Sequence, residues 1–249
     1  MRIKEKSKMK RKEKRGAAHI EIILSFVLFI SFLLFIFMFI NPTKRTEPSR
    51  VLLDIAEQGI EKSSSINVTS MVLKIEQSIS ENCFTIDLAE INISNIVGNK
   101  KAAVKDADDE VINSKKSGSI LQIQKSRDFY KIFLSEDFKE TSSSLVNCKD
   151  LDEENLTLGQ TKTTKIISFK KLAELKLNYE TGYENLKESF DFPTGNDFGF
   201  MIKDTKGNTI LNVLKEKPAG ISVIAREKPV QMVYENATFV SAMLNTQAW

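Results

Sequence analysis

A glycine and a glutamate stand just before the apolar part of this sequence, at a spacing that could support cleavage and assembly. Gly16 is followed by Ala17, and Glu21 lies four residues after Ala17. A cut between Gly16 and Ala17 would create a new α-amino group at Ala17 and make Glu21 the fifth residue of the mature chain. A carboxylate beside an apolar segment is costly unless it is paired, so the amino group of one subunit could neutralise Glu21 of its neighbour. If the chain is cut there, Glu21 therefore gains a charged partner on a neighbouring subunit.

An uncharged run, Ile22–Ile40, follows the glutamate, and only two of its residues are polar. A helix of this length rises about 28 Å, close to the hydrocarbon thickness of a bilayer. The run is apolar on every side and not only along one stripe. It is also longer than the apolar region of a secretory signal peptide, and no small-residue cleavage site follows it. The sequence therefore predicts an attached transmembrane helix over residues 17–41.

The charge of the chain is concentrated at its start. The net charge is +3, but residues 1–16 carry nine Lys or Arg against two Glu, so the remainder is acidic. Basic residues before an apolar helix indicate a cytoplasmic N-terminus, with everything after Asn41 outside. Because the positive charge belongs to this leader, the sequence gives no support for a nucleic-acid partner.

Basic residues, a glycine and then a helix with glutamate at its fifth position resemble the class III signal peptide of type IV pilins and archaeal pilin-like proteins. The resemblance implies that a prepilin-type peptidase cuts after Gly16 and that Ala17 becomes the N-terminus. It also implies that Glu21 pairs with the new amine when the helix packs into a filament or pseudofilament at the cell surface. The partners implied are the membrane, the peptidase and other pilin-like subunits.

The rest of the chain predicts an α+β fold in which the N-terminal transmembrane helix is followed by a β-rich exported domain with one or two helices. Residues 1–16 form the leader, residues 42–65 a connector with a short helix ending near Gly59, and residues 66–249 the exported domain, divisible near residues 150–170. Alternating apolar and polar residues predict strands at 68–75, 83–88, 119–124, 130–134, 166–169, 198–203, 209–214, 221–226, 230–234 and 238–244. Apolar residues three or four apart predict a helix over residues 171–190, and the polar stretch 100–118 is expected to be a loop or a boundary.

Two kinds of modification are compatible with export. Cys83 and Cys148 could form one disulfide, or they could be two independent buried thiols; their spacing excludes a CxxC redox or zinc site. Four Asn-X-Ser/Thr sequons make the chain a candidate glycoprotein. They begin at Asn67, Asn92, Asn155 and Asn236.

No motif of catalysis or cofactor binding is present. The sequence lacks GxSxG, Walker A, GxGxxG, HExxH and EF-hand patterns, and its one histidine, His19, stands beside the apolar run. The acidic residues 106–110 could bind a hard cation, but acidic runs are usually solvated loops. We therefore expect no enzyme, no cofactor and no metal. The favoured interpretation is a pilin-like structural subunit; the alternative is an unprocessed single-pass surface protein whose exported domain binds a ligand or partner.

Overall fold

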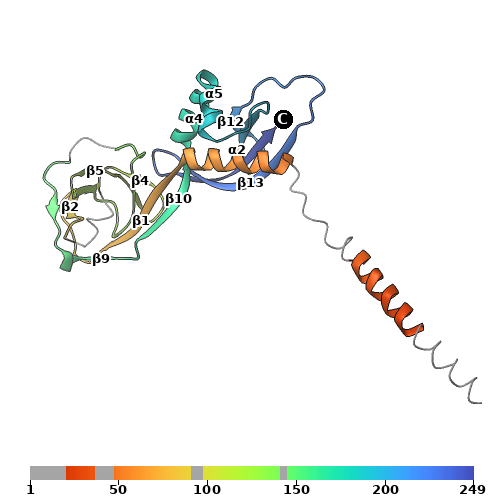
Figure 1. The fold of residues 1–249 in the computed structure, drawn as a ribbon. Helices are drawn as coiled ribbons and strands as arrows, with labels where there is room; N and C mark the ends of the chain where they lie inside the picture. Colours follow the sequence, from red (N-terminus) through yellow and green to blue (C-terminus); the bar gives the residue numbers. More distant parts are fainter. Residues whose placement is uncertain (1–20, 37–47, 91–97, 141–144) are drawn as a thin grey trace, which may run out of the picture. The chain divides into compact units, whose positions relative to one another are not determined.

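The computed structural model describes residues 21–36, 48–90, 98–140 and 145–249 (Figure 1). The chain divides into two compact units, residues 1–47 and residues 48–249.

The first unit contains one helix, residues 21–36, among the residues that the structure describes. The predicted transmembrane helix over residues 17–41 is wrong, because no helix within the described ranges is long and apolar enough to cross a membrane. The physical reason is length: sixteen residues rise about 24 Å, which is short of the roughly 30 Å of a hydrocarbon core. Both ends of the predicted span, 17–20 and 37–41, lie outside the described residues.

The second unit is sheet-rich. Its helices are α2 (Pro48–Ser64), α4 (Phe169–Thr181) and α5 (Tyr183–Ser189), with a 3₁₀ turn η1 (Glu153–Asn155). In chain order its strands are β1 (Ser65–Ile75), β2 (Cys83–Asp87), β3 (Lys101–Asp106), β4 (Val111–Ile112), β5 (Ser114–Ser117), β6 (Ile120–Gln124), β7 (Phe129–Ser135), β8 (Lys149–Asp150), β9 (Leu156–Leu158), β10 (Lys162–Ser168), β11 (Phe198–Asp204), β12 (Thr209–Val213), β13 (Ile224–Val233) and β14 (Phe239–Ala248).

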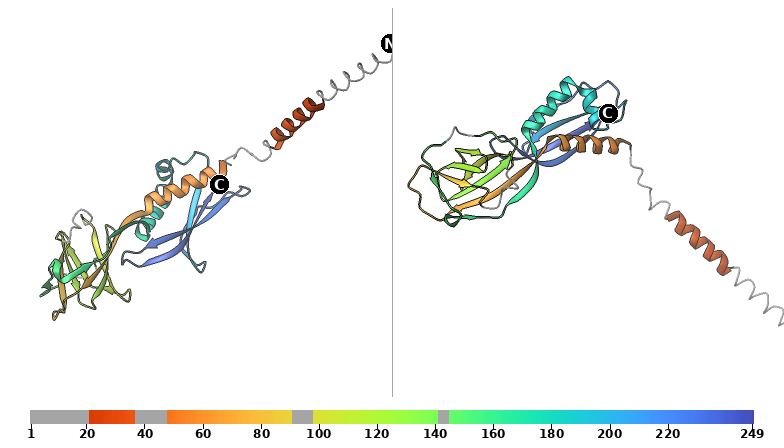
Figure 2. Two further views of the ribbon diagram at one scale, coloured as in Figure 1. Left: turned by 90° about the horizontal axis from the view of Figure 1, so that it is seen from below. Right: turned by 60° about the vertical axis from the view of Figure 1, so that its left-hand side comes forward.

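A mixed sheet of ten strands runs through the whole second unit. Its order is β12-β11-β14-β13-β10-β1-β7-β3-β4, and β9 pairs with β1 beside this path. Only the β10–β13 pair is parallel among its described pairs. A second sheet has the order β5-β6-β2-β8. Figure 2 shows α2 leading directly into β1, the strand at the middle of the large sheet.

The two large apolar clusters lie on the same face of the ten-stranded sheet. Ile167 of β10 is paired with Ser65 of β1, so its side chain shares a face with the odd-numbered residues of β1. Ile167 belongs to the cluster covered by the helices, and Leu73 and Ile75 of β1 belong to the cluster covered by the small sheet. The helices and the small sheet therefore cover two ends of one sheet face.

The opposite face is covered near its middle by a third, smaller cluster. Val68 of β1 and Ile166 of β10 belong to it, together with Phe138, which follows β7 and is 1% exposed. Ala237, in the turn between β13 and β14, completes the cover. The turn is therefore packed against the core on one side.

Helix α2 is held to the large sheet by an apolar stripe flanked by ion pairs. Leu53, Ala56 and Ile60 are spaced by three and four residues and are buried. The Arg226 guanidinium on β13 donates to Asp54 Oδ1 at 2.6 Å and to Glu57 Oε2 at 3.2 Å. The helix is thus fixed in register on the sheet.

Two predicted helix boundaries differ in the structure. The helix expected to end at Gly59 continues to Ser64, because Gly59 serves packing: a Cβ there would lie within 3.0 Å of three ring atoms of Phe190. The helix expected over residues 171–190 is divided into α4 and α5 at Gly182, whose N–H donates to Asn178 O at 2.8 Å.

Because Gly59 lies against the Phe190 ring, we expect Gly59→Ala to destabilise the protein. At an ordinary helical position the change stabilises by about 0.5–1 kcal/mol. Here the methyl group would displace the Phe190 ring, and we expect a net loss of about 1–3 kcal/mol, as for other overpacked cores. Urea unfolding of the full chain measures the effect, and Ser63→Ala, at an exposed position of the same helix, is the control. A stability gain for Gly59→Ala equal to that expected from helix propensity would contradict the packing role.

Candidate functional site

The helix of residues 21–36 presents apolar side chains on all its sides. Twelve large apolar residues between Ile22 and Phe35 are each at least 36% exposed. Glu21, the first residue of the described helix, is exposed as well. The processing residues Gly16 and Ala17 and the single histidine, His19, lie outside the described residues. An apolar surface of this kind marks a segment that associates with another apolar surface.

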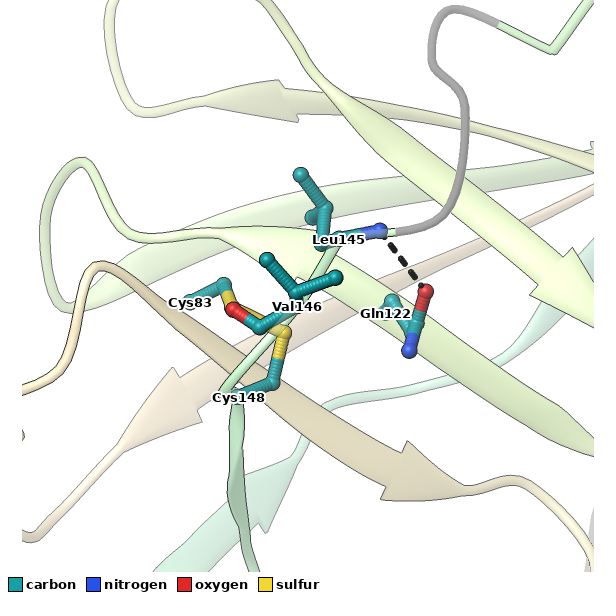
Figure 3. Close-up of a disulfide and its surroundings, with 5 residues drawn as sticks. All are labelled: Cys83, Gln122, Leu145, Val146 and Cys148. Atoms are coloured by element: carbon teal, nitrogen blue, oxygen red, sulfur yellow. Dashed lines mark hydrogen bonds between the residues drawn. A yellow bond between two sulfur atoms is a disulfide. The ribbon is translucent and has the colours of Figure 1, made fainter.

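The predicted disulfide is confirmed. Cys83 and Cys148 are joined with their Cα atoms 4.6 Å apart, across 65 positions of sequence (Figure 3). Cys83 begins β2, and Cys148 directly precedes β8, the strand that pairs in parallel with β2. Nearby, the Leu145 backbone N–H donates to Gln122 Oε1 at 3.1 Å. The bridge therefore fixes the outer strand of the small sheet, where two residues alone form the pairing.

The sequons lie in different surroundings. Asn67 is exposed on β1, between two paired strands, and Asn155 is half-buried at the end of η1. Asn236 is exposed in the turn between β13 and β14. Asn92 lies outside the described residues. Among the three described sequons, the acceptor asparagine is therefore exposed in two, at Asn67 and Asn236, and half-buried in the third, at Asn155.

A cavity of about 770 Å³ opens beside the β13–β14 turn. Its walls include an aromatic pair, Phe169 at the start of α4 and Tyr234 at the end of β13, with ring centroids 4.9 Å apart. Asn236 and Thr238 line it from the turn. Its volume falls within the range of about 300–1,000 Å³ that is usual for small-ligand sites. Sequence reasoning missed this cavity because its walls come from segments some sixty-five residues apart.

Opposite charges stand at the rim of the cavity. Lys170 Nζ is 3.8 Å from Glu235 Oε1, and both side chains are more than 40% exposed. The Lys139 backbone N–H donates to Glu235 O at 3.0 Å, which ties the segment after β7 to the turn. The rim can therefore offer both a hydrogen-bond donor and a hydrogen-bond acceptor to a neutral, hydroxyl-rich ligand.

The acidic run 106–110 forms the turn between β3 and β4. Burial opposes ionisation of Asp106, but the Glu110 N–H, the Ser126 hydroxyl and the Asp108 N–H donate to its carboxylate and lower its pKa. Lys131 Nζ contacts Asp109 Oδ1 at 2.8 Å. Within the described residues no group of three or more potential ligands could hold a metal ion. The carboxylates of Asp106 and Asp109 thus stabilise the hairpin.

A buried polar cluster at the start of β11 has a structural role that the sequence did not reveal. Tyr179 Oη donates to Phe198 O at 2.5 Å, and the Phe198 N–H donates to Tyr183 Oη at 2.9 Å. Burial raises the pKa of Tyr179 to about 12 and raises that of Tyr183 as well. Lys187 Nζ pairs with Asp197 Oδ1 at 3.3 Å, and Asp197 exchanges both backbone hydrogen bonds with Trp249. The hydroxyls and charges therefore hold the ends of β11 and β14.

No family model, curated protein or solved structure matches this chain.

The disulfide allows a direct test of its contribution. In the loop-entropy model, a bridge across a loop of this length contributes about 4 kcal/mol. We expect Cys83→Ser with Cys148→Ser to lower the free energy of unfolding by roughly this amount, measured by urea unfolding of the full chain.

The reductant provides the control for this change. Dithiothreitol should destabilise the natural chain and leave the double variant unaffected. Hydrogen exchange should show the loss of protection first in β2 and β8, the strands beside the bridge. Equal loss at β11 and β14, on the helix-covered end, would contradict a local role.

Proposed function

We propose that this protein is a pilin-like structural subunit that is cleaved after Gly16 and assembles through its N-terminal apolar helix into a surface filament or pseudofilament. The observation that carries the proposal is the described helix of residues 21–36, which exposes apolar side chains on every side, with the exposed Glu21 at the first described residue. A side-by-side array of such helices would bury these side chains. At about 25 cal/mol per Å² of apolar surface, this burial is a strong driving force for association.

The charge at the start of the helix would set the axial stagger. In an array, Glu21 of one subunit would lie against the Ala17 amine of a neighbour, and each charge would be worse off alone in an apolar surrounding. Apolar packing by itself is non-directional. The ion pair would therefore supply the register that apolar packing lacks.

The disulfide supports the exported location that we propose for the second unit. Bridges such as Cys83–Cys148 form and persist in oxidising compartments outside the cytoplasm. We accordingly propose that the basic leader faces the cytoplasm and that residues 48–249 are displayed at the cell surface. The proposed partners are the membrane, a prepilin-type peptidase and other pilin-like subunits, and the proposed role is structural and not catalytic.

The processing step predicts a defined N-terminus. Mass spectrometry of the protein recovered from its own cells should find a mature chain that starts at Ala17. A substitution at the residue before the cut, Gly16→Val, should retain the leader, while Ala107→Val, at an exposed position of the second unit, should be processed normally. Recovery of the natural chain with residues 1–16 attached would support the alternative of an unprocessed surface protein.

The assembly step predicts a charge requirement. Glu21→Gln keeps the size of the side chain but leaves the neighbouring amine unpaired, and breaking a buried pair in this way costs about 3–5 kcal/mol. We expect normal cleavage and a more than about tenfold loss of sedimentable assemblies, counted also by electron microscopy. Ser25→Ala, one turn further along the same helix, is the control. Undiminished assembly of Glu21→Gln would sink the proposed pairing.

A further inference from the structure

We propose that Asn236 carries an N-linked glycan whose first sugar is seated on the Tyr234 ring, in the cavity beside the β13–β14 turn. The inference goes beyond the structural role proposed above and does not depend on it. It rests on the geometry of five consecutive residues, 234–238, and of the cavity that they share with the start of α4.

The turn brings the sequon and the aromatic residue before it to one cavity. The Tyr234 N–H donates to Thr238 O at 3.0 Å, and the Ala237 N–H donates to Tyr234 O at 3.0 Å, which closes a tight hairpin. Ala237 has a φ of 57°, and its side chain is fully buried in the third apolar cluster. The other residues of the turn, Tyr234, Glu235, Asn236 and Thr238, instead line the cavity. An aromatic ring, the acceptor amide and the sequon hydroxyl thus face one space.

The backbone orients the acceptor amide. Asn236 Oδ1 accepts a hydrogen bond from the Thr238 N–H at 3.1 Å, so the other amide atom, Nδ2, is turned away from the chain. The residue itself is exposed at the tip of the hairpin. The nitrogen that would be modified is therefore accessible while the side chain is held in one orientation.

The cavity fits the apolar side of a sugar ring. Aromatic faces attract C–H groups, and the C–H face of a pyranose would lie on Tyr234 with Phe169 beside it. These two rings are 4.9 Å apart with an interplanar angle of 43°, so together they form a shallow seat. Lys170 and Glu235 at the rim could hydrogen-bond the sugar hydroxyls. The seat thus offers both an apolar floor and polar edges.

The modification is a balanced group transfer. Asn236 Nδ2 attacks the anomeric carbon of the first sugar of a polyprenyl-phosphate-linked oligosaccharide, and an N–C bond forms. The bond between that carbon and the phosphate oxygen breaks, its electron pair leaves with the lipid phosphate, and the amide loses one proton. Nothing is oxidised or reduced.

The other described sequons lack this combination. Asn67 has Ser65 two residues before it, and its Thr69 is fully buried with Oγ1 2.9 Å from Thr163 Oγ1. Asn155 is half-buried, and its backbone carbonyl accepts from the Glu76 N–H at 3.0 Å. Asn236 is therefore the described sequon at which acceptor and seat coincide.

The test uses the full chain produced in a host that exports it and N-glycosylates Asn-X-Thr sequons, and only molecules with the Cys83–Cys148 bridge formed are counted. The bridge certifies that the domain reached the oxidising compartment, so the result does not depend on filament assembly. Peptide mass spectrometry should find Asn236 occupied at least about tenfold more than Asn67. Bridged chains with Asn236 unmodified, whether or not another sequon is occupied, would overturn the proposal.

The seat is tested by thermal unfolding of chains made with and without the host's glycosylation. The glycan should raise the Tm of the natural chain by about 2–4 °C, a typical shift for one modest interaction in a domain of this size. In Tyr234→Leu and in Phe169→Leu, which keep an apolar side chain, the increment should fall to less than half. Val72→Leu, at a half-exposed position on β1, is the control and should keep the full increment. An increment unchanged by both aromatic substitutions would overturn the seat.

Discussion

The second unit depends on a helix and a strand that follow one another without a loop. Helix α2 ends at Ser64, whose hydroxyl donates to Ile60 O at 2.6 Å, and β1 begins at the next residue. Strand β1 then pairs with β10 and β9 along one edge and with β7 along the other. Because α2 contributes to the helix-covered core and β1 to the core under the small sheet, this one stretch of chain links the two cores. A shift of β1 by a single residue would move each of its side chains to the opposite face of the sheet and would disrupt both cores.

Features that arise from neighbouring residues were predictable. The hairpin of β11 and β12 follows from its turn, where Asp204 Oδ1 accepts from the N–H groups of Lys206 and Asn208 at 2.8 Å each. Most strands were predictable from alternation because one face of the large sheet is buried. The bridge between Cys83 and Cys148 was predictable as a pairing because only two cysteines are present in the sequence. In each case the signal and the structure occupy the same short segment, or no competing partner exists.

Features that depend on distant partners were not predictable. Residues 100–118 contain β3, β4 and β5, although the stretch is polar and was expected to be a loop or a boundary. Asp106, the last residue of β3, accepts a hydrogen bond from Ser126, which lies between β6 and β7. The polarity of the stretch does not reveal this distant partner. In the sequence, Gly59 resembles the end of a helix. In the structure, the Phe190 ring fills the space that a side chain at this position would need. Hydropathy predicted a helix over residues 17–41, whereas the structure describes a helix only over residues 21–36. The polarity and the secondary-structure propensity of neighbouring residues give no information about such long-range contacts.

The distribution of exposed apolar residues separates the two units. In the described part of the second unit the exposed large apolar residues, such as Val72 and Phe129, are scattered, as on any globular surface. In the helix of residues 21–36 they are contiguous and surround the axis. A domain that satisfies its own cores has no need of a neighbour, whereas an all-apolar helix must find one. This contrast is the physical basis for our proposal that the N-terminal helix associates and that the folded unit, with the Asn236 turn, is displayed.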